Sequence, residues 1–128
     1  MNKIIFITSS AHEEEILAHR NVLDPEIVFE FIPACKGTLF TNFPNAIKKK
    51  PICMVLYKTN LLTVREILSM ASQEVPRIPF VYGDIDDVER IQRDDILSQL
   101  NLFRIPYFQN ELLLFEYLRK NTTPIISG

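Results

Sequence analysis

The chain has only 3 glycines in 128 residues, too few for the glycine-rich loops that hold phosphates. A dinucleotide-binding fingerprint needs G-x-G-x-x-G and a P-loop needs G-x-x-x-x-G-K-[ST], and neither pattern occurs. The G-x-S-x-G pattern of a nucleophile elbow is missing too. Because no nucleophile and base can be paired from the sequence, we expect a protein that is not an enzyme.

Cysteine is also scarce. Cys35 and Cys53 lie within or beside apolar runs, form no C-x-x-C pair and have no histidine at ligand spacing. We therefore expect two buried free thiols in a reducing cytoplasm.

One set of histidines has the spacing of a metal site. His12, Glu15 and His19 stand at i, i+3 and i+7, so they share one face of a helix and could bind a metal. No further ligand is visible near them, and we favour an exposed polar helix face. We expect neither a metal nor a cofactor.

An excess of positive charge is lacking as well. The chain has 14 Lys and Arg against 16 Asp and Glu, a net charge of −2. A domain that contacts DNA phosphates is normally basic, so we expect no direct nucleic-acid contact. The apolar run at residues 4–7 is too short for a signal peptide or a membrane span, which predicts a cytoplasmic protein without a membrane segment.

The chain does contain short apolar runs that alternate with helical patterns. The spacing of apolar residues predicts a helix after Ser10 and a final helix over residues 111–120. Residues 35–50 could form a short helix, but Gly37 and Pro44 favour an irregular segment. Two further helices are predicted at 63–72 and from Asp84 or Asp86 to Leu100, and strands at 3–7, 27–32, 52–57, 78–82 and 102–105.

This alternation predicts an α/β fold. Short loops between strands and helices imply a parallel sheet covered on both faces. Five strands in about this length indicate a three-layer flavodoxin-like sandwich with strand order 2-1-3-4-5. We expect one domain at residues 1–121, followed by an exit segment or linker at 122–128.

Four stretches resemble the receiver domains of bacterial response regulators. Residues 3–7 are similar to the first receiver strand, and residues 51–57 to the third strand, which delivers the phosphoacceptor. Residues 75–82 resemble the stretch of the form xxxPVIVLT. Residues 105–112, Ile-Pro-Tyr-Phe-Gln-Asn-Glu-Leu, resemble KPFxxxEL at the start of the last helix, where the proline of the family follows a cis peptide bond.

Receiver chemistry needs carboxylates that hold Mg²⁺, an aspartate that accepts the phosphoryl group, and a Ser or Thr and a Lys that bind its oxygens. Every one of these positions departs from the family pattern here. The resemblance thus implies the fold and a degenerate phosphorylation site. Its positions are Thr8 and Ser9 for the acidic pair, Tyr57 (or Lys58 in a register shifted by one) for the acceptor, Gly83 or Tyr82 for the switch residue, and Ile105 for the lysine.

The kinship indicates a pseudo-receiver, an atypical receiver that works without phosphorylation. Such domains form the N-termini of some flagellar and biofilm transcription activators that work with sigma-54. We therefore expect a regulatory signal-transduction domain of a bacterial transcriptional regulator, acting through a protein partner or a homodimer. In receivers the fourth helix, fifth strand and fifth helix form the usual dimer surface, which here predicts Tyr107, Phe108, Leu114 and Tyr117 as interaction residues.

A small-ligand sensor is the alternative. Hydroxyl and amide side chains gather where the predicted strands end, at the edge where this fold class binds ligands. They could hold a small, nucleotide-like molecule, although such groups more often satisfy one another and the strand ends. The residues are Thr8, Ser9, Ser10, Thr59 and Asn60.

Overall fold

The computed structural model describes residues 2–34, 38–74 and 79–122. A five-stranded sheet has the order β2-β1-β3-β4-β5, and all neighbouring strands are parallel. This confirms the predicted flavodoxin-like fold and its strand order. The strands are β1 (Lys3–Thr8), β2 (Val28–Pro33), β3 (Cys53–Tyr57), β4 (Phe80–Gly83) and β5 (Tyr107–Phe108).

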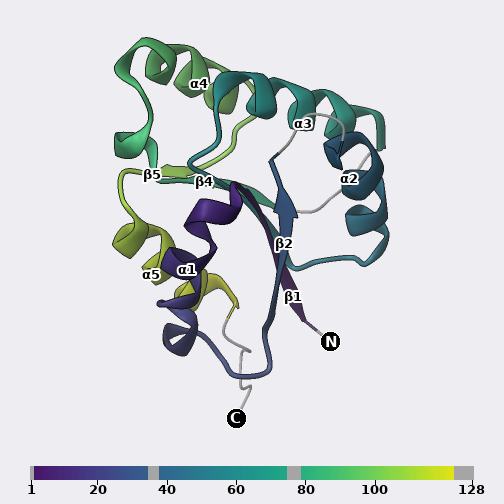
Figure 1. Cartoon of the computed structure of the whole chain (residues 1–128), viewed down its shortest axis with the longest axis vertical. Coiled ribbons are helices and arrows are strands. Elements are labelled where there is room, and N and C mark those ends of the chain that lie inside the picture. The colour runs from purple at the N-terminus through teal and green to yellow at the C-terminus, as the bar shows by residue number, and fades with distance from the viewer. Residues whose placement is uncertain (1, 35–37, 75–78, 123–128) are drawn as a thin grey trace.

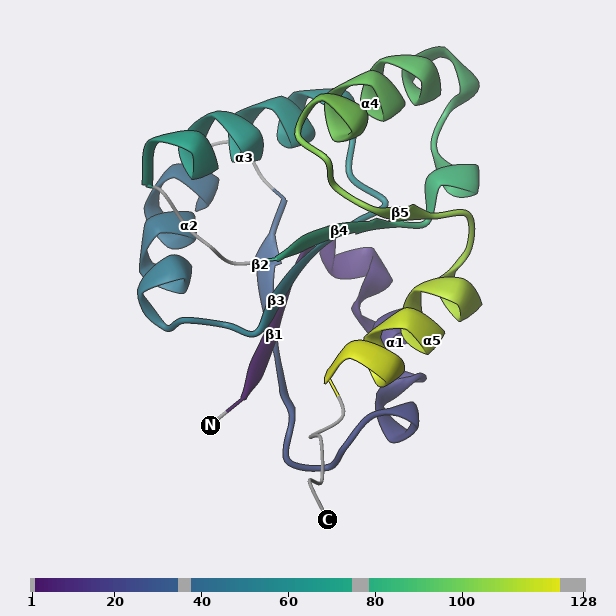
Figure 2. The same ribbon diagram turned by 180° about the vertical axis from the view of Figure 1, so that it is seen from behind.

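Helices cover both faces of the sheet. Helices α1 and α5 lie on one face, and α2, α3 and α4 lie on the other (Figures 1 and 2). The α-helices are α1 (Glu13–Leu17), α2 (Thr38–Lys48), α3 (Leu61–Glu74), α4 (Arg90–Leu102) and α5 (Glu111–Thr122), and the short 3₁₀ helices are η1 (Ser10–His12), η2 (Arg20–Val22) and η3 (Ile85–Asp87).

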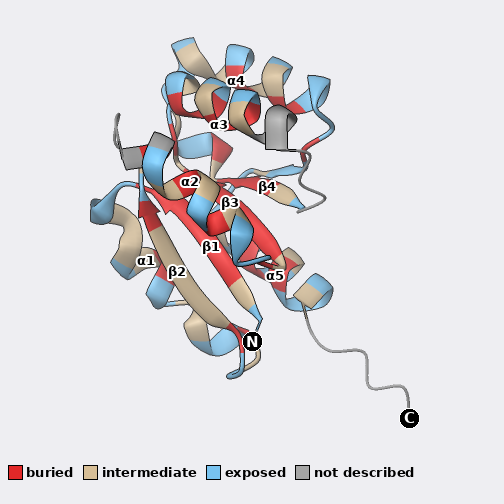
Figure 3. Cartoon of the chain, turned by 90° about the vertical axis from the view of Figure 1, so that its right-hand side faces the viewer, coloured by how far each residue is buried: buried red, intermediate tan, exposed pale blue. Residues whose placement is uncertain are grey.

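The central strands are buried on both faces, as Figure 3 shows for β1 and β3. Alternate residues of a strand point to opposite faces, so Ile5 and Met54 pack under α2–α4 while Phe6 and Val55 pack under α1 and α5. The edge strand β2 is only half-buried along most of its length. Continuous apolar runs are therefore confined to the strands with a neighbour on each side.

Residues 38–48 form a regular helix, so the irregular segment that Gly37 and Pro44 favoured is wrong for this part. Pro44 lies inside α2 and removes one backbone hydrogen bond, which costs about 3 kcal/mol in a helix interior. Leu39, Phe43 and Ala46 are buried in the core beneath α2. Burial of a Leu or Phe side chain contributes about 1.5–3 kcal/mol, so the apolar face outweighs the proline.

The predicted fifth strand at residues 102–105 is also wrong. Helix α4 continues to Leu102, and β5 is the two-residue strand Tyr107–Phe108. Arg104 has a left-handed backbone with φ of 58° and donates its N–H to Asn101 O at 3.2 Å, while Ile105 N donates to Leu100 O at 2.8 Å. These two bonds form a Schellman motif that ends the helix, with arginine where glycine is usual.

This ending moves Ile105 away from the carboxyl edge of the sheet. Tyr107 lies beside Tyr82 and Phe108 beside Gly83, so Ile105 lies near the start of β4. At about 3.3 Å per residue it is roughly 10 Å below the edge. Ile105 therefore does not lie with Thr8, Tyr57 and Gly83 at the carboxyl edge. The cis peptide bond of the described residues joins Gly83 to Asp84, and the Ile105–Pro106 bond is not cis.

The remaining predictions about chain organisation have mixed outcomes. Cys53 is a buried free thiol, and burial raises its pKa to about 12, whereas Cys35 lies outside the described residues. Of the expected exit segment, Thr122 still belongs to α5, and residues 123–128 lie outside the description. In the part of the chain that is described, no helix has the length and apolar character needed to cross a membrane.

Candidate functional site at the carboxyl edge of the sheet

Three of the predicted degenerate positions meet at the carboxyl edge. Thr8, Tyr57 and Gly83 are the last residues of β1, β3 and β4. The Thr8 hydroxyl donates to the backbone oxygen of Tyr57 at 2.8 Å, and Tyr57 lies beside Gly83 in the sheet register. Ser9 follows as the N-cap of η1, where its Oγ accepts from Ala11 N at 3.4 Å. The hydroxyls of Thr8 and Ser9 therefore serve the local backbone.

Gly83 is required by close packing against α5. A Cβ atom at this position would lie 2.6 Å from Cδ2 and 3.2 Å from Cγ of Leu114. Leu114 is fully buried, so it has little room to move away. A serine or threonine at this position would thus collide with Leu114 of α5.

Lys58, directly after β3, is the centre of an ion-pair cluster. Its Nζ lies 2.9 Å from Glu15 Oε2, 3.4 Å from Asp87 Oδ2 and 4.0 Å from Asp84 Oδ2. The backbone of Lys58 has a left-handed φ of 53°, which costs an L-residue about 1–2 kcal/mol. The Lys58 side chain is 11% exposed, and its ammonium group joins α1, the end of β3 and the segment after β4.

The Tyr57 side chain extends the cluster towards α5. Its hydroxyl donates to Glu15 Oε2 at 3.1 Å and lies 3.4 Å from Glu111 Oε2. His19 Nε2 lies 3.3 Å from the same Glu111 oxygen, and its ring stacks on Phe115 with centroids 4.6 Å apart. Helices α1 and α5 are therefore tied to each other through the end of β3.

The charges of the cluster stabilise one another. The hydrogen bond from Lys58 outweighs the effect of burial and holds the pKa of Glu15 below its usual value. Burial on its own would lower the pKa of Lys58, but the hydrogen bond to Glu15 and the charge of Asp87 raise it overall. Burial raises the pKa of Asp84 despite the nearby Lys58. A lysine kept protonated in this way is a poor nucleophile and serves as a fixed cation.

Tyr57 is also a poor proton donor in chemical terms. Burial, together with the negative charges of Glu111 and Glu15, raises the pKa of its hydroxyl. A neutral phenol can donate a hydrogen bond to a carboxylate, which is what the distances to Glu15 indicate. Tyr57 therefore serves as a structural hydrogen-bond donor at the end of β3.

His12, Glu15 and His19, which could bind a metal by their spacing in the sequence, do not all come together in the structure. His12 Nδ1 lies 3.7 Å from Glu15 Oε2, but His19 turns to Glu111. Among the described residues, no group of three or more His, Cys, Asp or Glu side chains is placed to hold a metal ion.

The hydroxyl-lined edge is largely engaged in internal bonds. Asn60 Oδ1 accepts from Thr63 N at 2.9 Å at the start of α3, and the Tyr82 hydroxyl donates to the backbone oxygen of Thr59 at 2.5 Å. Thr59 Oγ1 is buried without a hydrogen-bond partner. One hydroxyl of the expected set is therefore left with an unused hydrogen-bonding capacity.

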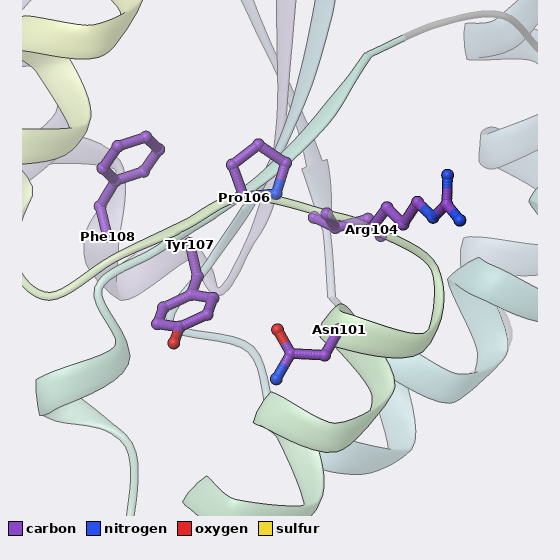
Figure 4. A pocket seen from close by; sticks show the side chains of 6 residues that line it. Asn101, Arg104, Pro106, Tyr107 and Phe108 are labelled. Carbon is purple, nitrogen blue, oxygen red and sulfur yellow. The ribbon is translucent and has the colours of Figure 1, made fainter.

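A second candidate feature is the groove between α4 and β5. It is shallow and open to solvent, with a volume of about 540 Å³, and is lined by residues from the end of α4, from β5 and from the turn between them. In Figure 4 the Asn101 side chain points toward the ring of Tyr107, while Phe108 points to the other side of the strand. We call it the α4–β5 groove; its lining residues are Asn101, Arg104, Ile105, Pro106, Tyr107 and Phe108.

The predicted interaction residues have different surroundings. Tyr107 is exposed, whereas Phe108 and Tyr117 are half-buried and pack together with centroids 4.8 Å apart. Leu114 is fully buried against the sheet, so the prediction that it belongs to an interaction surface is wrong. The face of α5 that meets the sheet includes Leu114, and the neighbouring Leu112 and Leu113 are exposed instead.

Comparison with known proteins gives no match to a family model, to a curated protein or to a solved structure.

Sequence reasoning missed the ion-pair cluster almost entirely. From the sequence, Lys58 is only a shifted acceptor position, and Glu15 is only one member of the helix face that it shares with His12 and His19. One signal was available: a single lysine directly after a fully apolar strand, with the acidic stretch of residues 84–87 after the next strand. Because both strands end at the same edge, these charges had to lie near each other.

Proposed function

We propose that this chain is a receiver-like regulatory domain that works without phosphorylation, by contact with a second copy through the α4–β5 groove. Its setting, in this proposal, is the cytoplasmic signal-transduction pathway of a bacterial transcriptional regulator, as its N-terminal domain. The single observation that carries the proposal is the groove with its exposed apolar border.

The residues of the carboxyl edge support a role without phosphoryl transfer. Tyr57 stands at the end of β3 and Gly83 at the end of β4, and neither can accept a phosphoryl group as an aspartate does or bind one as a threonine does. The Lys58 ammonium already neutralises part of the carboxylate charge there. Regulation by the proposed domain therefore requires a change of partner, not a change of covalent state.

The groove supports contact with a protein. Tyr107 and Arg104 are exposed lining residues, and the exposed Leu102 and Phe103 stand in the chain between the lining residues Asn101 and Arg104. Aromatic and arginine side chains are enriched at protein interfaces, while an exposed cluster of large apolar side chains is uncommon on a monomer. A two-fold pair of such grooves would bury these side chains against their counterparts.

The oligomeric state tests this proposal. The molar mass of the wild type is measured by light scattering across a dilution series, beside Tyr107→Ser and Phe103→Ser. We expect a dimer that dissociates on dilution and weaker association in both variants, because each loses an exposed aromatic side chain at the groove. Leu17→Ser, an exposed leucine on α1, is the matched control. A wild type that stays monomeric at every concentration contradicts the proposal.

A ligand sensor is a second candidate, favoured by one observation. Thr59 Oγ1 is buried without a partner close to Lys58 and the start of α3. A small polar ligand that reached this hydroxyl would stabilise the fold in proportion to its occupancy. Thermal unfolding is followed with nucleotides added singly, for the wild type and Thr59→Val. A rise in melting temperature seen only with threonine would favour the sensor, and no rise with any nucleotide would exclude this class of ligand.

A further inference from the structure

The charges of the molecule are divided unevenly between the two ends of the sheet. Four segments follow the strands or open the helices at the carboxyl edge. Ion pairs of Lys58 with Glu15 and Asp87 join three of them, and a hydrogen bond from Asp86 N to Gln109 O at 3.1 Å joins the fourth. We call residues 9–15, 58–62, 84–91 and 109–113 the carboxyl-edge face. They hold eight of the 16 acidic residues of the chain but two of its 14 basic residues, a net charge of −6.

Much of this negative charge has no internal cation. Lys58 pairs with Glu15, Asp84 and Asp87. Glu14, Asp86 and Glu89 are exposed, and no ion pair to them is found within the part of the chain that the structure describes. Exposed carboxylates in such a group repel one another, so a cation brought by a partner would lower their energy.

Large apolar side chains border the same face. They stand in the first turns of three helices that all begin at this edge (Figure 1): Leu62 on α3, Ile91 on α4, and Leu112 and Leu113 on α5. Their side chains are 55%, 88%, 68% and 43% exposed, respectively. Exposed leucine and isoleucine around a charged centre are typical of a surface that another protein covers.

We infer that the carboxyl-edge face binds a basic protein segment that carries apolar anchors, such as an amphipathic segment rich in Lys or Arg and Leu. The charge favours a basic partner and the border favours apolar side chains on it. A second copy fits this face poorly. Its basic run, Lys48–Lys50, has no large exposed apolar residue beside it in the described part of the chain. This surface is separate from the α4–β5 groove, so it stands or falls independently of the proposed dimer.

The test uses a fluorescein-labelled peptide of Lys and Leu in an amphipathic pattern, read out by fluorescence anisotropy on the full chain. Peptides of Glu and Leu and of Lys and Ser serve as comparisons. Glu14→Gln with Glu89→Gln removes two unpaired charges of the face, and Ile91→Ser with Leu112→Ser removes two apolar anchors. Matched controls lie elsewhere: Glu26→Gln with Glu116→Gln, and Leu17→Ser with Val22→Ser.

We expect saturable binding of the Lys/Leu peptide that weakens on the order of threefold for each face charge removed, weakens also in the apolar variant, and falls with added salt. The controls should bind as the wild type does. Equal losses in the control variants would reveal general charge attraction and overturn the inference. So would absent binding, or equal binding of the Glu/Leu peptide. The wild type could also self-associate, and the double variant Glu14→Gln with Glu89→Gln could abolish that association. This result would assign the face to a second copy and would also overturn the inference.

Discussion

The carboxyl edge and the α4–β5 groove lie in the same half of the sheet but satisfy their side chains in different ways. At the edge, Lys58 and Tyr57 bind carboxylates of the same chain at 2.9 and 3.1 Å. At the groove, the lining residue Tyr107 is exposed to solvent, as are Leu102 and Phe103 between the lining residues Asn101 and Arg104. The paired centre of the edge, around Lys58 and Tyr57, therefore stabilises the fold with its polar groups, whereas the groove leaves apolar surface uncovered and available to a partner.

This difference separates stability from function. A substitution among the paired charges of the edge leaves a partly buried charge without its partner, which is costly. A substitution at an exposed apolar residue of the groove removes few contacts of the folded chain, which is cheap. Four substitutions, Lys58→Met, Tyr57→Phe, Glu15→Gln and Leu102→Ser, test this difference.

Lys58→Met should have the largest effect. Methionine keeps most of the apolar length of lysine but leaves Glu15, Asp84 and Asp87 facing one another. We expect the free energy of unfolding to fall by about 2 kcal/mol, less than for a fully buried pair because Glu15 is part-exposed. Urea unfolding at neutral pH measures this.

Two comparisons make the Lys58 result specific. Lys120→Met removes the exposed pair with Glu116 and should change stability by less than about 0.5 kcal/mol. Adding Asp84→Asn to Lys58→Met should recover part of the loss, because it removes one of the repelling charges. If Lys58→Met and Lys120→Met lowered the free energy of unfolding equally, the ion-pair cluster would stabilise the fold no more than an exposed surface pair.

Tyr57→Phe should have a smaller effect. It removes the hydroxyl that donates to Glu15 and keeps the buried ring, so we expect a loss of about 1 kcal/mol. Tyr107→Phe, at the exposed residue of the groove, is the control and should be neutral in the same urea experiment. If Tyr107→Phe lowered the free energy of unfolding more than Tyr57→Phe does, the stabilising hydroxyl would belong to the groove and not to the edge.

The dependence of stability on pH should also reflect the edge. The folded-state pKa of Glu15 lies below its usual 4.5, so its pairing stabilises the fold above that value and is lost as the pH falls through the folded-state pKa. Asp84 acts in the opposite direction, since its pKa is raised and its protonation relieves a cost.

Glu15→Gln isolates the first of these contributions. Melting temperatures from neutral pH to below pH 4.5 should fall less steeply in the variant than in the wild type. Glu116→Gln, on the exposed part of α5, should follow the wild-type curve. Parallel curves for the wild type and Glu15→Gln would show that the Lys58 pair contributes nothing to acid sensitivity.

Leu102→Ser should have the smallest effect on stability. The side chain is exposed at the end of α4, so we expect a change within about 0.5 kcal/mol. Its effect should be seen in light scattering instead, as weaker self-association. A loss of stability as large as that of Lys58→Met would mean that the groove is part of the core.

The sequence predicted the sheet well because its central strands are short apolar runs. Ile4–Ile7 and Met54–Tyr57 are buried on both faces and have no polar position to confuse the pattern. The fifth strand could not be found in this way. A strand of two residues is too short to show an alternating pattern. The end of α4 was also hidden, because the left-handed residue that ends it is Arg104 and not the usual glycine.

The candidate site was predictable only in part. The alignment of strand ends brought Thr8, Tyr57 and Gly83 together correctly. It could not show that Lys58 turns back into the edge, because a left-handed backbone at lysine has no sequence signal. The exposure of Leu112 and the burial of Leu114 depend on the rotation of α5 on the sheet, which an almost uniformly apolar helix does not fix.

The proposal of a domain that works without phosphorylation is tested most directly by attempting to phosphorylate it. The wild type is incubated with acetyl phosphate and Mg²⁺, and its intact mass is measured by mass spectrometry. Because Tyr57 ends β3, Lys58 follows it and both are held by carboxylates of the same chain, we expect an unchanged mass. A stoichiometric phosphoryl adduct on any residue of the carboxyl edge would contradict it.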